Sequence, residues 1–169
     1  MLPENYIFET QLRCYATLYY ILGILENELR LRVVITLSNH ALEKGYAEWF
    51  TILVQDKKCA KSIRQVTNNS MNYRGGIAGK LTFGFWTRLF VGRNYSLLWT
   101  PALHQVFPAL ERPLELQSFH RVCTNMFRAN QIRNRIAHYE FYETLEFEQE
   151  KSVLMWLLDR MYGSEKKAS

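Results

Sequence analysis

Residues 6–40 read YIFETQLRCYATLYYILGILENELRLRVVITLSNH and carry the strongest structural signal in the chain. Apolar side chains recur there every three or four residues, in the series Leu12, Tyr15, Leu18, Tyr19, Leu22, Leu25, Leu29, Val33 and Leu37. This spacing gathers them on one face of an α-helix. We expect one long helix, or two with a bend at Gly23, because glycine in a helix costs about 1 kcal/mol relative to alanine.

Further segments also have helical patterns, and Gly45 marks the end of the first one. We expect a polar helix over 57–66, an apolar helical segment over 81–90 whose aromatic side chains form core, a helix of about 25 residues opened by Pro113, and a last amphipathic helix over 147–161. Residues 67–76 form the clearest loop. The sequence contains no strand pattern, repeat or glycine-rich phosphate loop. The expected fold is therefore an all-α helical bundle.

Length and composition fit one domain, which we place over residues 1–162, with a disordered polar tail over 163–169. The chain has 169 residues, and 48% of them are hydrophobic, enough to form a packed core. No run of about 18 uncharged apolar residues is present, and the first four residues lack the basic start of a secretory signal. We therefore expect a soluble, cytoplasmic protein that has no membrane partner.

The cysteines and the charge of the chain limit the possible functions. Cys14, Cys59 and Cys123 lie too far apart for a zinc site, so we expect reduced, mostly buried thiols and no metal or cofactor. The net charge of +5 and pI of about 9.2 favour an acidic partner such as nucleic acid. Basic residues surround the 67–76 loop, namely Lys57, Lys58, Lys61, Arg64, Arg74 and Lys80. They form either a phosphate-binding rim or a solvated helix face.

The most informative motif is Arg133-Asn134-Arg135-Ile136-Ala137-His138, near the end of the helix that follows Pro113. An imidazole transfers protons near neutral pH, and a guanidinium binds phosphate. On an ideal helix Arg133 and His138 stand about 140° apart, so one copy of the motif makes a sparse site. Two copies related by a two-fold axis would bring two imidazoles and up to four guanidinium groups together.

Such a composite site has the groups needed to cut RNA without a metal ion. It binds the phosphate, neutralises its developing charge and moves protons, while the ribose 2′-hydroxyl acts as the nucleophile. The products would be a cyclic phosphate and a free 5′-hydroxyl, and DNA would be inert. The alternative is purely structural: His138 and the arginines would cap the last carbonyls of the helix.

Arg133 through Glu140 resembles the Arg-Asn-x-x-Ala-His-x-Glu signature of the Abi-like (abortive infection) branch of the HEPN superfamily. The segments 81–90 and 98–103 are similar to the family's Leu-Ser-Phe-Gly and Leu-Trp segments, and 25–30 to part of its first long helix. The resemblance covers roughly residues 10–160 in the expected order. Tyr139 stands where many members have a second histidine, and Phe141 where proline often follows the glutamate.

The resemblance implies a HEPN-like, usually dimeric bundle that acts as a metal-independent endoribonuclease, in the role of a toxin or phage-defence effector. It assigns catalysis to Arg133 and His138, with Asn134 as the polar residue beside them. We expect substrate binding by Arg135, Tyr139 and Arg128. RNA, a second copy of the chain and an antitoxin are the expected partners. The alternative is an inactive HEPN module that binds RNA or a nucleotide, or that pairs with a nucleotidyltransferase or antitoxin.

Overall fold

The structure is a computed structural model and describes residues 4–68, 76–100, 102–111, 116–140 and 142–163. Within these ranges the chain is helical and contains no β-strand. The α-helices are α1 (Glu4–Glu43), α2 (Lys57–Asn68), α3 (Phe83–Arg88), α4 (Leu103–Val106), α5 (Leu116–Ala137) and α6 (Thr144–Tyr162). Shorter 3₁₀ segments are η1 (Trp49–Gln55), η2 (Ala78–Lys80) and η3 (Gly92–Asn94), and η4 (Tyr95–Trp99) is π-helical.

Helix α1 is one continuous helix of 40 residues, which settles the choice between one helix and two. Gly23 introduces no break, since glycine keeps the backbone N–H that the helix needs. The helix ends in a Schellman turn in which Gly45 has a φ of 76°. There Gly45 N donates to the Leu42 carbonyl at 2.9 Å and Tyr46 N to the Ala41 carbonyl at 2.9 Å. Gly45 therefore ends the first helix, as predicted.

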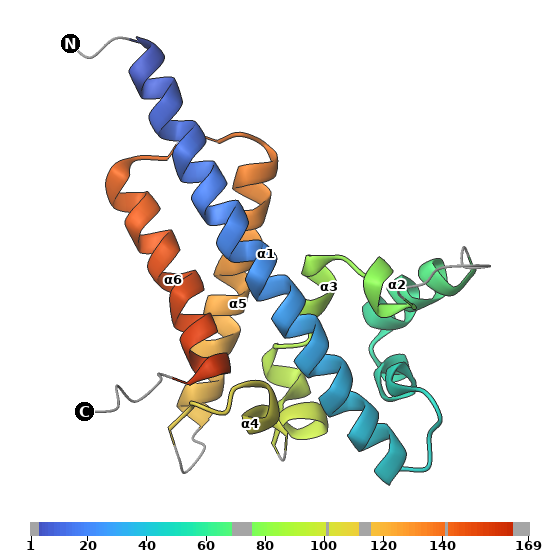
Figure 1. The fold of residues 1–169 in the computed structure, drawn as a ribbon. Coiled ribbons are helices and arrows are strands. Elements are labelled where there is room, and N and C mark those ends of the chain that lie inside the picture. Colours follow the sequence, from blue (N-terminus) through green and yellow to red (C-terminus); the bar gives the residue numbers. More distant parts are fainter. Residues whose placement is uncertain (1–3, 69–75, 101, 112–115, 141, 164–169) are drawn as a thin grey trace.

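Helices α1, α5 and α6 pack against one another and form the body of the bundle (Figure 1). Each contributes one apolar stripe to a common core, as the helical periodicity predicts. The fully buried members include Leu18, Leu25, Leu29 and Val33 of α1, Phe119, Val122, Met126 and Ile132 of α5, and Leu154, Leu157 and Met161 of α6. The protein is thus an all-α, single-domain bundle.

The first turns of α1 project past this core, so part of the predicted apolar stripe faces solvent (Figure 1). Leu12 is 44% exposed and Tyr19 is 71% exposed, although both follow the same spacing as the buried leucines. Helix periodicity identifies one face, but only a packing partner buries it. An exposed apolar group therefore lies beside the end of α5.

The aromatic segment around α3 is core, as predicted. Trp86 is fully buried and stacks on Trp49, with ring centroids 5.7 Å apart. Phe90 stacks on Trp99 at 4.5 Å, and Trp99 Nε1 donates to the Leu89 carbonyl at 2.8 Å. These contacts bind α3 and η4 to the bundle and remove the rings from any stacking role with RNA bases.

The helices predicted after α1 are confirmed with shifted ends. Helix α2 runs to Asn68, α5 has 22 residues, and α6 begins at Thr144. Pro113, most of the 67–76 loop and the tail after Gly163 lie outside the described residues. Within the described residues no helix has the length and apolar character needed to cross a membrane.

Candidate functional site at the end of α5

The sequence motif lies at the C-terminal end of α5, where backbone N–H groups cap the helix. Tyr139 N donates to the Ile136 carbonyl at 3.1 Å, and Glu140 N donates to the Arg135 carbonyl at 3.0 Å. These bonds form the same Schellman turn as at the end of α1. The backbone, rather than the side chains of Arg133 and His138, therefore supplies this cap.

Tyr139 occupies the left-handed position of that turn, with a φ of 55°. Among the described residues it is the one non-glycine residue with a positive φ. A side chain in this conformation costs roughly 1 kcal/mol or more. The Tyr139 ring packs edge-on against Tyr15 of α1 at 6.0 Å, yet remains 76% exposed. The motif end thus holds a strained, exposed tyrosine beside His138.

Arg133 and Asn134 are both exposed on α5. Arg133 Nη1 donates to Asn134 Oδ1 at 3.4 Å. Arg133 also lines a hollow of about 580 Å³ between α1 and α5, which it shares with Tyr15, Ala16, Tyr19, Leu22, Gly23, Glu26, Ile136, Ala137 and Tyr139. The hollow is mostly apolar, with the guanidinium at its edge.

His138 is the first residue after α5 and is exposed. Its backbone N–H bonds to the Asn134 carbonyl at 3.1 Å. Its imidazole makes no hydrogen bond or ion pair within the described part of the chain, and it does not line the hollow that Arg133 borders. In one chain, therefore, Arg133 borders this hollow and His138 is exposed outside its lining.

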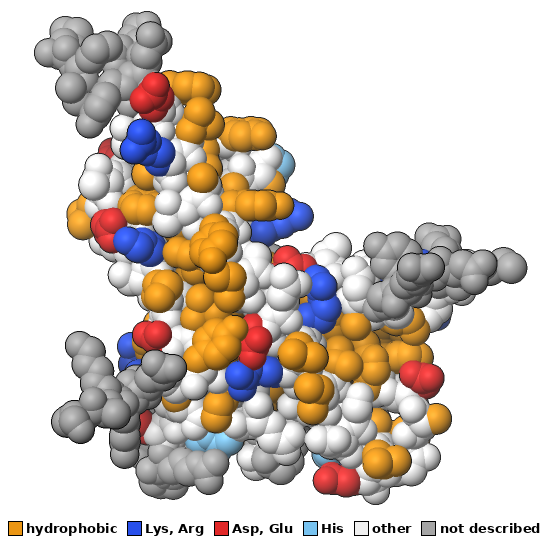
Figure 2. Space-filling view, in the orientation of Figure 1, with side chains coloured by type: hydrophobic (Ala, Val, Ile, Leu, Met, Phe, Trp, Pro, Cys, Tyr) orange, Lys and Arg blue, Asp and Glu red, His pale blue; other side chains and the backbone are white. Residues whose placement is uncertain are grey.

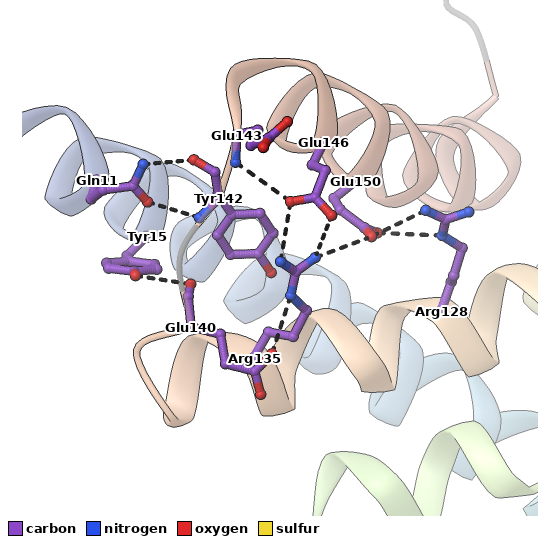
Figure 3. Close-up of polar contacts among 9 residues, drawn as sticks. All are labelled: Gln11, Tyr15, Arg128, Arg135, Glu140, Tyr142, Glu143, Glu146 and Glu150. Atoms are coloured by element: carbon purple, nitrogen blue, oxygen red, sulfur yellow. Dashed lines mark hydrogen bonds and ion pairs between the residues drawn. The ribbon is translucent and has the colours of Figure 1, made fainter. Parts of the chain in front are cut away.

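The two other arginines face α6 and contact its carboxylates (Figure 3). Arg135 lies 3.4 Å from Glu140, 3.3 Å from Glu146 and 4.0 Å from Glu150. Arg128 donates to both oxygens of Glu150, at 3.1 and 3.4 Å. We call these five side chains the Arg135 network. It satisfies the largely buried Glu150 carboxylate and links α5 to α6.

The Arg135 network shifts the pKa values of its members. Burial alone would lower the pKa of Arg135, but the hydrogen bond with Glu146 and the neighbouring acidic groups raise it. The same bond, with a second from Glu143 N, lowers the pKa of Glu146. Arg135 also lies over the Tyr142 ring at 4.1 Å, and burial raises the pKa of that phenol to about 12. Tyr142 therefore stays neutral at physiological pH.

Helix α1 holds the turn that follows the motif (Figure 3). Gln11 Nε2 donates to the Tyr142 carbonyl at 2.6 Å, and Tyr142 N donates to Gln11 Oε1 at 3.0 Å. Tyr15 Oη donates to the Glu140 carbonyl at 2.9 Å. Helix α1 thus fixes the backbone that follows His138 at Glu140 and at Tyr142.

The structure therefore separates the predicted site residues into two groups. Arg133, Asn134, His138 and Tyr139 are exposed, whereas Arg135 and Arg128 are paired with carboxylates. RNA contacts by the latter two remain a prediction. The sequence interpretation missed Gln11, Tyr15, Glu146 and Glu150, which support the motif from α1 and α6. The sequence does contain one indication that Glu150 is buried, because it lies four residues before Leu154 on the buried stripe of α6.

The three predicted thiols differ in burial. All three are free thiols; Cys59 is buried and the others are half-buried. Burial raises the pKa of Cys59 and of Cys123 to about 11, which keeps both as thiols at neutral pH. In the described ranges, no three His, Cys, Asp or Glu residues cluster so that they could hold a metal ion.

Comparisons of this chain with family models, with curated proteins and with solved structures find no match. The Abi-like resemblance therefore depends on the octet at 133–140 and on the order of the similar segments. The helical bundle and the position of the octet at a helix end are what the structure contributes.

Proposed function

We propose that the protein is a metal-independent endoribonuclease of the HEPN type, completed by a second copy of the chain. The observation that carries the proposal is the state of His138: an exposed, unpaired imidazole next to a helix end that the backbone already caps. The alternative, in which the side chains of Arg133 and His138 cap the helix, lacks support, because backbone N–H groups already bond to the last carbonyls of α5. Both side chains therefore remain available for chemistry.

The proposed reaction is transesterification of the RNA backbone. The ribose O2′ loses its proton to a base and bonds to the adjacent phosphorus, while the bond from phosphorus to O5′ breaks and O5′ takes up a proton. His138 serves as the proton-transfer group, and Arg133 stabilises the negative charge that develops on the phosphate oxygens. Asn134 orients the Arg133 guanidinium through its side-chain oxygen.

A second copy supplies what one chain lacks. Arg133 borders the α1–α5 hollow and His138 is exposed outside its lining, so each copy would offer its imidazole to the other's guanidinium. Exposed apolar side chains of α1 give the second copy a surface to bury: Tyr19 lines this hollow, and Phe8 and Leu12 lie on the same side of the helix. Figure 2 shows hydrophobic side chains gathered along the exposed face of α1. The proposed homodimer therefore packs through the first half of α1.

The test of catalysis is cleavage of labelled single-stranded RNA in excess EDTA. His138→Ala and Arg133→Ala should each lower the cleavage rate by about 100-fold or more. The matched control is His120→Ala, an exposed histidine nearer the start of α5, which should cut normally. DNA of the same sequence should survive, since it lacks the nucleophile. Undiminished cutting by His138→Ala would remove the imidazole from the mechanism.

Leu12→Glu tests the second copy. A charge in the exposed apolar group of α1 should convert the dimer to a monomer and abolish cleavage together, as seen by sedimentation and by RNA gels. Leu42→Glu, at the opposite end of α1 and 75% exposed, is the control and should keep both properties. A monomeric but fully active Leu12→Glu protein would show that one chain suffices.

The role as a toxin or phage-defence effector follows from the resemblance and is tested in cells. Expression of the unmodified chain in bacteria should arrest growth, and expression of His138→Ala should not. RNA binding in both proteins, without cleavage by either, would instead indicate the inactive binding module.

A further inference from the structure

The positive charge of the chain is concentrated in one segment. Between Lys57 and Leu110 there are eight Lys and Arg residues and no Asp or Glu. The rest of the chain contains 13 basic and 16 acidic residues. The entire positive excess therefore comes from this segment, which does not include the motif.

Helix α2 places half of these cations on one face. Lys57, Lys58, Lys61 and Arg64 are all exposed, and on an ideal helix they fall within about 120°. We call them the α2 basic face. The opposite side carries Cys59 and Ile63, both buried in the core. The helix thus presents only cations and uncharged polar groups to solvent.

The cations of the α2 basic face have no acidic partner in the described part of the chain. The carboxylate of Asp56 lies just before α2 in the sequence. It accepts hydrogen bonds from Lys58 N at 2.9 Å and Cys59 N at 3.2 Å, and it pairs with Arg93 at 2.6 Å. Asp56 is therefore already occupied as the helix cap.

A hollow of about 490 Å³ adjoins this face. Its lining includes Lys57, Lys58 and Arg93, together with Asn94 and Gln55. Three cations against the single carboxylate of Asp56 make the hollow attractive to an anionic group. The face and the hollow together form a continuous positive surface.

The dimensions and the burial of α2 favour a nucleic-acid strand over a lipid surface. From Lys57 to Arg64 the helix advances about 10 Å, the rise of about three phosphates along one strand. A helix that inserts into a bilayer needs a free apolar side, whereas that of α2 is buried against the protein. Figure 1 shows α2 to one side of the three long helices, away from the α5 end.

We propose that the α2 basic face, with Arg93 beside it, binds the phosphodiester backbone of single-stranded RNA at a distance from the α5 end. The identity of the polyanion rests on the proposed function. Cations without base-reading partners recognise phosphate and not sequence, so this contact adds affinity without specificity. The α5 end then cuts a strand that α2 holds.

The experiment uses a fluorescent single-stranded RNA with 2′-O-methyl groups, which binds but has no nucleophile for cleavage. Fluorescence anisotropy gives the affinity of the full chain and of the triple variant Lys57→Gln, Lys61→Gln, Arg64→Gln over a range of salt concentrations. The variant should bind at least roughly ten-fold more weakly at low salt, and its slope of log affinity against log salt should fall by about 2. The double variant Lys57→Gln, Lys61→Gln should show a smaller change and serves if the triple variant unfolds.

The matched control is Lys44→Gln, Arg121→Gln, Lys151→Gln, which removes three exposed or half-exposed cations from the turn after α1, from α5 and from α6. Equal losses in both triple variants would reduce the effect to net charge and overturn the proposal. Preferential binding to vesicles of anionic lipid, with no RNA binding, would overturn it in favour of a membrane. Because this RNA cannot be cut, the binding measurement tests the α2 proposal whether or not the protein cleaves RNA. Conversely, undiminished cutting by His138→Ala would refute the proposed mechanism and leave the α2 result intact.

Discussion

The end of α5 and the outer face of α2 both carry several cationic side chains, but these cations differ in whether carboxylates lie beside them. At the end of α5, Arg135 and Arg128 are paired with carboxylates of α6 and of the turn before it. On α2, four cations face solvent with no carboxylate among them. The first arrangement stabilises the fold, and the second is available to a partner.

This difference shows that a basic motif does not by itself mark a basic surface. Arg135 and Lys61 are both cationic helix residues, but Arg135 meets Glu146 and Glu150 because α6 packs against α5. The charge left at the motif belongs to Arg133, whose exposed guanidinium borders the α1–α5 hollow. Local sequence identifies cations, and tertiary packing determines which of them stay available.

The largest effect on stability is expected from Glu150→Ala. The Glu150 side chain is 10% exposed and accepts two hydrogen bonds from Arg128. Removing it leaves two guanidinium groups without their shared carboxylate, which should lower the free energy of unfolding by roughly 2 to 3 kcal/mol. Urea denaturation followed by circular dichroism measures the change.

Two control variants compare the loss of Glu150 with the loss of an exposed carboxylate and of a cation on α2. Glu148→Ala, on the same helix but 57% exposed and paired only with Lys151, should change stability by less than about 1 kcal/mol. Lys61→Ala on α2 should fall within about 0.5 kcal/mol of the unmodified chain. If Lys61→Ala proved as destabilising as Glu150→Ala, the two regions would not differ in the way described.

The long helices could be predicted from the sequence because their apolar spacing is regular over many turns. The short segments η3 and η4 could not be predicted. They depend on bonds to the Leu89 carbonyl from Asn94 Nδ2 of η3 at 3.0 Å and from Trp99 Nε1 of η4 at 2.8 Å, which only the folded core creates. The exposure of Leu12 could not be predicted either, because its spacing matches that of the buried Leu18. Periodicity gives the face of a helix and not its neighbour.

The site could be predicted only as far as the motif itself reaches. The octet was predicted to lie at a helix end, and the structure adds that Arg133 and His138 are exposed there. It could not reveal that Gln11, 131 residues away, holds the Tyr142 backbone, or that Glu150 neutralises Arg128. Such partners become neighbours only once α1 and α6 pack against α5.

Gln65→Glu should reduce the difference between the two regions, because it adds a carboxylate to α2. Gln65 is exposed on α2, one turn after Lys61, so a carboxylate there supplies the acidic neighbour that the face lacks. We expect affinity for the 2′-O-methyl RNA to fall roughly ten-fold at low salt. Gln117→Glu, exposed in the first turn of α5, makes the same change in net charge and should affect binding less. Equal losses would mean that the field of the whole chain, and not α2, governs binding.

Tyr139 offers a smaller test on the α5 side, because it stands in the turn position that Gly45 occupies after α1. Tyr139→Ala and Tyr139→Gly both lose the ring contact with Tyr15, but only glycine relieves the positive φ. The glycine variant should therefore be about 1 kcal/mol more stable than the alanine variant. Gly45→Ala should lose a similar amount. Thermal unfolding measures the stability of the three variants. Equal stability of the two Tyr139 variants would contradict a left-handed conformation at this position.

The smallest effect is expected from Glu146→Gln, and its sign depends on pH. Arg135 lowers the pKa of Glu146 below its ordinary value of 4.5, so this carboxylate stabilises the folded chain above that pH and ceases to do so as the pH falls through its lowered pKa. The difference in unfolding free energy between the unmodified chain and Glu146→Gln should thus be constant near neutrality and shrink in acid. Glu148→Gln corrects for net charge. Lys61→Gln on α2 should show no such loss, because that substitution removes no carboxylate. A Glu146→Gln difference that persists unchanged in strong acid would mean that its carboxylate contributes nothing through Arg135.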